Sequence, residues 1–128
     1  MDRIENIILR NLVFNEDYLR KVLPFIQPEY FNSRDEKIIF EHIAKYAVEY
    51  NSLVTQEILS IEIEERKDVT EQEVININKI INSLDKIDSD FDWLNDTTEK
   101  WCRDRAIYLA LMESIQIAND EDKKRTRD

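Results

Sequence analysis

The chain of 128 residues contains no glycine and only two prolines, Pro24 and Pro28. Phosphate-binding loops need backbone with no side chain near the phosphate, so the missing glycine excludes both a Walker loop and a dinucleotide-binding fingerprint. Tight hairpin turns with positive φ also prefer glycine, which argues against a β-rich fold. The sequence therefore favours an all-α fold and excludes nucleotide hydrolysis by a P-loop within this chain.

The composition indicates one acidic, folded domain. Hydrophobic residues make up 42% of the chain, which is enough for a core. There are 28 acidic and 18 basic residues, a net charge of −10. Because nucleic-acid binding depends on neutralising phosphates with Lys and Arg, we expect no direct DNA binding by this chain. Its acidic surface instead suits protein partners with basic patches.

Cellular location is constrained by two features. Cys102 is the only cysteine, so no internal disulfide forms and a reducing cytoplasm is compatible with the chain. No apolar run approaches the roughly 18 residues of a membrane span, and residues 1–10 have no signal-peptide pattern. We expect a soluble, cytoplasmic protein without membrane contact.

Three helices are predicted in the first part of the chain. Apolar residues at helical spacing indicate a helix over residues 2–13. Asn15 is a suitable N-cap for a second helix over residues 16–23. Residues 33–36, SRDE, form a capping box for a third helix, which Asn51 is suited to end.

Two further helices follow before the last one. Thr55 is a suitable cap for a fourth helix to about Arg66, although the alternation of Leu59, Ile61 and Ile63 also fits a strand. Residues 70–73, TEQE, form a second capping box in front of a clear helical stripe, and the polar residues 85–90 read as a turn. Together these patterns predict a small orthogonal bundle of about six helices. Its predicted core contains Ile8, Leu12, Phe31, Ile39, Phe40, Ile43, Ile77, Ile80 and Leu94.

The last helix is predicted over residues 93–117, which contain no glycine or proline. At 1.5 Å per residue it would be about 38 Å long, longer than the roughly 30 Å that spans a small domain. Residues 121–128, EDKKRTRD, contain no apolar residue, so we expect them to fray. The predicted domain covers residues 1–119, and residues 120–128 are predicted to be a frayed or disordered start of a linker.

Apolar residues lie nearly all the way around this long helix. Residues 94, 98, 101, 105, 108, 112 and 115 alternate in steps of four and three, the seam of a helix packed against another. Five short helices cannot easily cover the remaining apolar sides, so we expect the C-terminal half to dock on another chain or on a further segment. The predicted self-association or partner face consists of Trp101, Tyr108, Leu111, Met112 and Ile115.

No pattern in the sequence indicates an active site, a metal site or a bound cofactor. His42 is the only histidine, and no Ser or Cys motif points to it, so we interpret it as flanking the core. Residues 88–92 begin like a calcium loop, but Trp93 takes the place of the required glycine, which favours acidic caps of a helix. Cys102 is interpreted as a partly buried structural cysteine despite its neighbour Arg103.

The order of these features resembles the start of replicative helicases of the DnaB family. The resemblance covers residues 4–118 and is strongest to the helicases of T-even-type phages. It lies in the opening IILRNLVF of residues 7–14, in Asn15, in the step Glu29-Tyr30-Phe31, in Ile39-Phe40, and in WLNDTTEK with the later Arg105-Ala106. Each motif is short, and their ordered combination is what carries the resemblance.

This resemblance implies a small helical head that forms the collar of a hexameric ring and docks primase and helicase-loading proteins. It implies that unwinding is driven by a C-terminal RecA-like motor with ATP and Mg²⁺, which this chain lacks. In the family a further helix folds back on the long helix as a hairpin. The family's primase-contacting residues match no motif here, so none is assigned.

Two alternatives to a helicase N-terminal domain stay open at this point. One is a free-standing phage adaptor that imitates the collar and binds or blocks a replicative helicase. The other is the helicase-binding domain of a primase, whose fold is similar. A small helical enzyme is the class that the sequence favours least.

Overall fold

The computed structural model describes residues 3–125 of the chain. Within this range it contains six α-helices, two short 3-10 helices (η1 and η2) and no β-strand, which confirms the all-α prediction. None of the helices in this range is long and apolar enough to cross a membrane. In chain order the elements are α1 (Ile4–Phe14), α2 (Glu16–Val22), η1 (Leu23–Phe25), η2 (Pro28–Tyr30), α3 (Arg34–Tyr50), α4 (Gln56–Glu64), α5 (Glu71–Ser83) and α6 (Phe91–Arg125).

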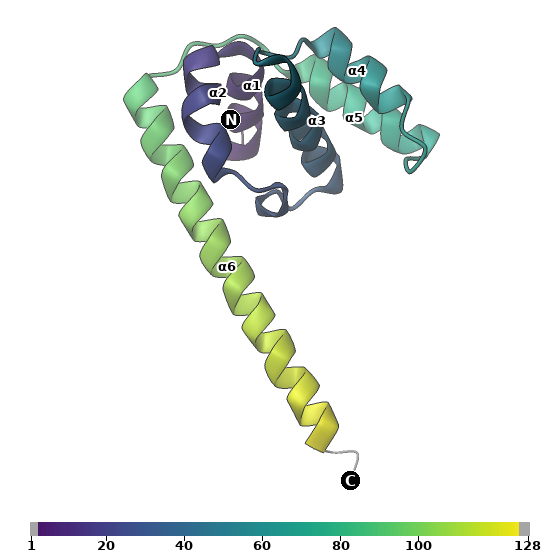
Figure 1. Ribbon diagram of the computed structural model, residues 1–128, viewed down its shortest axis with the longest axis vertical. Coiled ribbons are helices and arrows are strands. Elements are labelled where there is room, and N and C mark those ends of the chain that lie inside the picture. The colour runs from purple at the N-terminus through teal and green to yellow at the C-terminus, as the bar shows by residue number, and fades with distance from the viewer. Residues whose placement is uncertain (1–2, 126–128) are drawn as a thin grey trace.

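Helices α1 to α5 form a compact head, and α6 lies along one side of it and then projects away (Figure 1). Within the head, α1 contacts α2 and α3, while α4 and α5 pair with each other and pack on α3. The head contacts α6 through α2 and η2. In the described part of the chain, the N-terminal half of α6 therefore contacts the head and the C-terminal half projects from it.

The core lies where α1 to α5 and the start of α6 meet. Most of the predicted core is confirmed, because its members are almost inaccessible to solvent. Ile80 is the exception: it is only partly buried and packs against the edge of the core. The confirmed residues are Ile8, Leu12, Phe31, Ile39, Phe40, Ile43, Ile77 and Leu94.

The predicted N-caps are confirmed with one partial exception. The side chains of Asn15 and Thr55 accept hydrogen bonds from main-chain amides in the first turns of α2 and α4. At the start of α5 both hydrogen bonds of the capping box are present, between Thr70 and Glu73. At α3, Ser33 Oγ accepts from the Glu36 amide, but the Glu36 carboxylate returns no hydrogen bond.

The half-formed capping box at α3 has a visible cause. The Glu36 carboxylate turns toward α1, where its Oε1 lies 3.5 Å from Arg3 Nη2. Its side chain is only 2% exposed there, so it is removed from water as well as from the amide that the sequence pattern assigns to it. The predicted reciprocal bond is therefore wrong at this helix, although the helix itself begins where expected.

The end of α3 and the identity of α4 follow the sequence. Asn51 adopts the left-handed conformation at φ 51° and ψ 41°, which ends α3 without a glycine. Residues 56–64 are helical rather than extended: Leu59 and Ile63, one helical turn apart, are fully buried, while Ile61 is 50% exposed. The helical interpretation of this segment is confirmed.

The long helix exceeds the prediction at both ends. It has 35 residues, from Phe91 to Arg125, rather than residues 93–117. Residues 120–125 are thus helical where fraying was expected, because no glycine or proline interrupts them and Glu, Lys and Arg are good helix formers. Residues 126–128 of the predicted linker lie outside the described part of the chain.

Candidate functional site

The first half of α6 docks tightly on the head. Its start is capped by Asp90, whose Oδ1 accepts a hydrogen bond of 2.9 Å from the Trp93 amide. Along the docked face Leu94 and Thr98 are at most 1% exposed. Thr98 Oγ1 lies 2.6 Å from Tyr18 Oη, a buried hydrogen bond that joins α6 to α2. The predicted seam is therefore an intramolecular contact over these residues.

Trp101 belongs to this docked part, and its assignment to the partner face is wrong. It is only 8% exposed, and its ring lies with its centroid 5.0 Å from that of Phe31 and 6.0 Å from that of Tyr30. The spacing of the seam residues does not show how far along α6 the head covers them. The head covers Trp101 as well, which the prediction had placed on the exposed face. Trp101 is a core residue of the monomer.

Arg105 marks the end of the docked part. Its Nε donates to the Tyr30 carbonyl oxygen at 2.5 Å, and its Nη2 donates to Asn32 Oδ1 at 2.8 Å. Its guanidinium also lies 4.9 Å from the centre of the Tyr108 ring, the next residue of the seam. Arg105 thus fixes the point at which α6 leaves the head.

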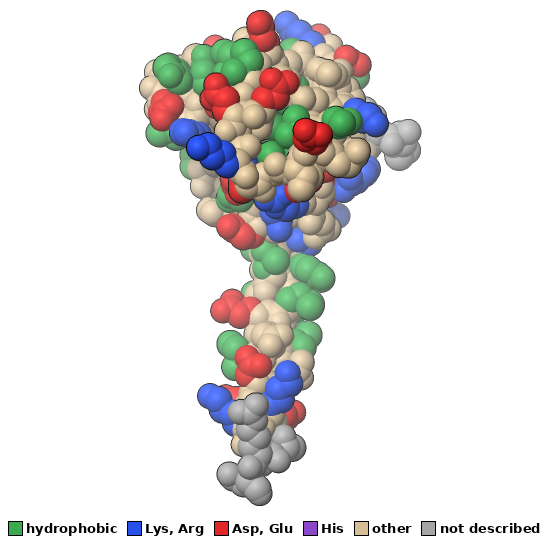
Figure 2. Space-filling view, turned by 90° about the vertical axis from the view of Figure 1, so that its right-hand side faces the viewer, with side chains coloured by type: hydrophobic (Ala, Val, Ile, Leu, Met, Phe, Trp, Pro, Cys, Tyr) green, Lys and Arg blue, Asp and Glu red, His purple; other side chains and the backbone are tan. Residues whose placement is uncertain are grey.

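Beyond this point the seam continues without a partner. We name Tyr108, Leu111, Met112 and Ile115 the α6 stripe; these four predicted face residues are 48%, 59%, 46% and 53% exposed. Their spacing of i, i+3, i+4 and i+7 places them on one face of the helix. Ile107 and Ile117 are also more than half exposed on other sides. Residues 106–125 extend about 30 Å from the head, and Figure 2 shows hydrophobic side chains along this projection.

The exposed stripe has the composition of an interface rather than of a solvated surface. It carries one Tyr, one Met, one Leu and one Ile, and aromatic residues and Met are enriched at the buried centres of interfaces. Contiguous apolar patches of this kind on a helix rimmed by charges mark interaction sites. The sequence-based expectation that α6 has more apolar surface than its own head can cover is confirmed.

The residues considered for chemistry take structural positions. His42 Nε2 lies 3.2 Å from Arg66 Nη1, which can only donate, so Nδ1 carries the proton and faces Glu62 Oε1 at 3.4 Å. Within residues 3–125 no group of three or more His, Cys, Asp or Glu side chains is arranged to hold a metal ion. His42 is thus a partner of Glu62 in α4 and of Arg66 just after it.

Cys102 is a buried thiol and not an activated one. It is 9% exposed, and burial raises its pKa to about 11. The neighbouring Arg103 and Arg105 do not offset this effect, because one is paired with Glu99 and the other with Tyr30 and Asn32. The structural interpretation of Cys102 is confirmed.

A groove beside Cys102 was not predicted from the sequence. It lies between the α2–η1 segment and α6 and includes Phe25, which is 68% exposed. The available signal was Pro24, which sets the 3-10 turn that presents Phe25 to solvent, but the partner wall of the groove comes from residues about 75 positions away.

Comparison with known proteins shows a similarity to part of a longer relative. No protein-family model matches the chain. The chain is 33% identical over 111 residues to a protein of Enterobacteria phage T4 described as a DnaB-like replicative helicase. The aligned part covers 87% of this chain but only 23% of that relative, so the chain spans less than a quarter of the relative's length. The chain is therefore related over most of its length to a DnaB-like replicative helicase, which confirms the resemblance that its motifs indicate.

Proposed function

We propose that the chain is the N-terminal collar domain of a phage-type replicative helicase, and that it pairs with another subunit through the α6 stripe. The observation that carries the proposal is the exposed stripe itself. It continues the seam that buries Leu94, Thr98 and Trp101, and it ends in solvent. The 33% identity to a relative described as a DnaB-like replicative helicase supports the assignment to a helicase.

The projecting half of α6 needs a partner for an energetic reason. Most helical stability in proteins comes from packing an apolar face, and the α6 stripe is about half exposed rather than packed. Covering the stripe removes the exposed parts of four large side chains from water. Complete burial of such a side chain is worth about 1.5–3 kcal/mol, and about half of each one is still exposed. A second copy presents the same stripe, so the α6 helices of two copies can pack together and cover each other's exposed side chains.

A double substitution on the stripe tests the pairing. The variant Tyr108→Asp with Met112→Asp should keep its helical circular dichroism, since both side chains are about half exposed, and should be monomeric. The matched control is Val48→Asp with Ile61→Asp, which places two charges at residues that are 79% and 50% exposed on the head. Light scattering should show a dimer or larger assembly for the unmodified chain and for the control. Equal masses for all three proteins would refute the assignment.

We further propose that the collar docks primase and a helicase loader, while ATP, Mg²⁺ and strand unwinding belong to a RecA-like motor elsewhere in the parent protein. The net charge of −10 supports docking of basic protein surfaces rather than of DNA. Titration of the chain with the purified primase, the loader and a single-stranded oligonucleotide tests this division. Binding of the proteins that weakens with salt, without binding of the oligonucleotide, is the expected result. Tight oligonucleotide binding would contradict it.

A further inference from the structure

Arg105 connects the head to the first residue of the α6 stripe. Its Nε donates to the Tyr30 carbonyl oxygen at 2.5 Å, and its Nη2 donates to Asn32 Oδ1 at 2.8 Å. The carbon at the centre of the same guanidinium group lies 4.9 Å from the centre of the Tyr108 ring. One side chain therefore contacts both the η2 turn of the head and the exposed stripe.

These contacts use the particular shape of an arginine side chain. A guanidinium group is flat and carries its N–H donors in a fixed fork, so one edge can donate to two oxygens while its face stacks on an aromatic ring. In Arg105 the edge formed by Nε and Nη2 is used by the head. Because the group is rigid, these two hydrogen bonds also determine how its face meets Tyr108.

The docking of α6 on the head does not depend on Arg105. Leu94, Thr98 and Trp101 are 0%, 1% and 8% exposed, and they bury the docked half of the helix. The helix then continues to Arg125. Since Arg, Lys and Gln have similar helix propensities, Arg105→Gln and Arg105→Lys should keep the helix and its docked half in place.

We infer that Arg105 is a positioning residue for the pairing proposed above, on which this role depends. It holds the Tyr108 ring in place before a second copy binds, so the ring loses less conformational freedom on pairing. The contact between a cation and an aromatic ring also becomes stronger when water is removed from it. Pairing that covers Tyr108 therefore gains stability from Arg105, although Arg105 is not part of the stripe.

The same contacts couple the η2 turn to pairing. Asn32 is exposed and lies outside the α6 stripe, but it holds Arg105 from the side of the head. By linkage, the factor by which the Asn32–Arg105 bond strengthens pairing is also the factor by which pairing strengthens that bond. A protein that binds at Asn32 and draws its side chain away from Arg105 therefore weakens the pairing of two chains.

Dissociation constants of the paired full chain, measured by sedimentation equilibrium, test this role. Arg105→Gln should weaken pairing by about tenfold, because the desolvated cation–π contact and the ordering of the ring are both lost. Arg105→Lys should weaken it by a similar factor, since an ammonium group keeps the charge but has neither the flat face nor the fork. Both variants should keep the helical circular dichroism of the unmodified chain.

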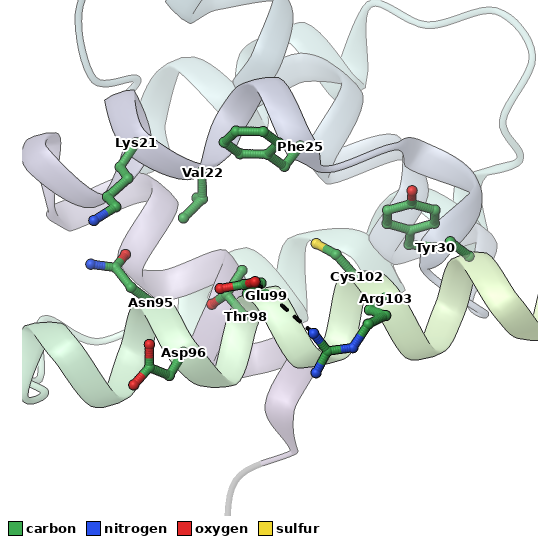
Figure 3. A pocket seen from close by; sticks show the side chains of 11 residues that line it. Lys21, Val22, Phe25, Tyr30, Asn95, Asp96, Thr98, Glu99, Cys102 and Arg103 are labelled. Atoms are coloured by element: carbon green, nitrogen blue, oxygen red, sulfur yellow. Dashed lines mark ion pairs between the residues drawn. The ribbon is translucent and has the colours of Figure 1, made fainter.

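Arg103→Gln is the matched control. It removes the same charge from α6, but Arg103 lies on another side of the helix, 4.0 Å from Glu99 (Figure 3). Because an exposed ion pair contributes little, its dissociation constant should stay within about twofold of that of the unmodified chain.

Asn32→Ala tests the coupling to the head. It should weaken pairing by about threefold in the unmodified chain, since one hydrogen bond to Arg105 is lost. In the Arg105→Gln background it should have no further effect, because the two residues act through one contact. An equal effect in both backgrounds would mean that Asn32 acts without Arg105, and the coupling would be wrong.

The outcomes separate this role from the pairing itself. If the unmodified chain pairs and Arg105→Gln pairs equally well, Arg105 is not a positioning residue, while the proposed pairing stands. Full pairing by Arg105→Lys would have the same meaning, because charge alone would then be sufficient. A chain that is monomeric at every concentration would refute both the pairing and the role of Arg105.

Discussion

Tyr18 Oη and Thr98 Oγ1 lie 2.6 Å apart in a buried hydrogen bond that joins residues 80 positions apart in the sequence. Tyr18 is fully buried and Thr98 is 1% exposed. Burial raises the pKa of the Tyr18 phenol far above its ordinary value, so the hydroxyl stays protonated at any physiological pH. This bond joins α2 to the docked half of α6.

Removing one of the two hydroxyls should lower the free energy of unfolding. Removing both should lower it by less than the sum of the two single effects. Tyr18→Phe leaves the Thr98 hydroxyl buried and unpaired, at a cost of about 1–3 kcal/mol, and Thr98→Val does the same to the phenol. In the double variant neither polar group remains, so the two effects should be non-additive by about 1 kcal/mol. Urea unfolding of the four proteins measures this coupling. Strict additivity would show that the two hydroxyls do not interact.

The sequence predicts local features of this fold better than long-range ones. Thr70 with Glu73 and Asn51 adopt the expected cap geometry because each depends on neighbours within a few residues. The pairing of Glu36 with Arg3 crosses from α3 to α1, so local spacing cannot indicate it. The capping-box pattern therefore predicts the helix start at Ser33 correctly and the direction of the Glu36 carboxylate wrongly.

The same distinction explains the outcome for the candidate site. Periodicity places Trp101 and Tyr108 on one face of α6, and the structure agrees, but it cannot show that the head covers Trp101 and stops before Tyr108. That limit depends on η2, where Tyr30 meets both Trp101 and Arg105. The groove beside Phe25 is likewise formed by segments distant in sequence, and no local pattern indicates it.

Because Trp101 is buried and the α6 stripe is exposed, replacing a side chain by alanine should change the stability of the monomer differently at the two places. Trp101→Ala should lower the unfolding free energy by about 3–5 kcal/mol, since it removes a buried aromatic side chain. Met112→Ala should change the stability of the monomer by no more than about 0.5 kcal/mol, because Met112 is 46% exposed. Denaturation in urea at a concentration low enough to keep the chain monomeric measures both effects.

Trp101→Phe is the matched control for the first variant. The Trp101 Nε1 is buried without a hydrogen-bond partner, so phenylalanine keeps most of the ring contacts and gives up no hydrogen bond. Its cost should be well below that of Trp101→Ala. If Met112→Ala proved as costly as Trp101→Ala in the monomer, the projecting half of α6 would have to be packed on the head.

Glu36 predicts a pH-dependent difference in stability. Burial, as the largest cause, raises the pKa of this carboxyl above its ordinary value of 4.5, and the nearby Arg3 only partly offsets the effect. Between 4.5 and the raised pKa, the folded chain keeps a proton that the unfolded chain has released. The contribution of this group to the unfolding free energy therefore falls as the pH rises through that window.

The variant Glu36→Gln should remove this dependence. The stability of the variant, measured relative to the unmodified chain, should be greater at pH 7 than at pH 4. At pH 4 Glu36 is largely protonated in both the folded and the unfolded chain, so burying it costs little there. Urea unfolding at the two pH values gives the difference, and Glu64→Gln, at an exposed residue of α4, is the control for the loss of one carboxylate. A larger relative gain at pH 4 would mean that the Arg3 pair outweighs the burial of the carboxylate.

Cys102 should react slowly with alkylating reagents. Burial raises its pKa to about 11, so at pH 8 well under one per cent of the thiol is ionised, and the sulfur is also shielded because the residue is 9% exposed. Iodoacetamide labelling followed by mass spectrometry should be more than about tenfold slower than for Cys102→Ser with Ser114→Cys, which places the only thiol on the exposed part of α6. The rate for Cys102 should rise to that of the control in urea. Equal rates in the folded proteins would contradict the docking of α6 on the head at this residue.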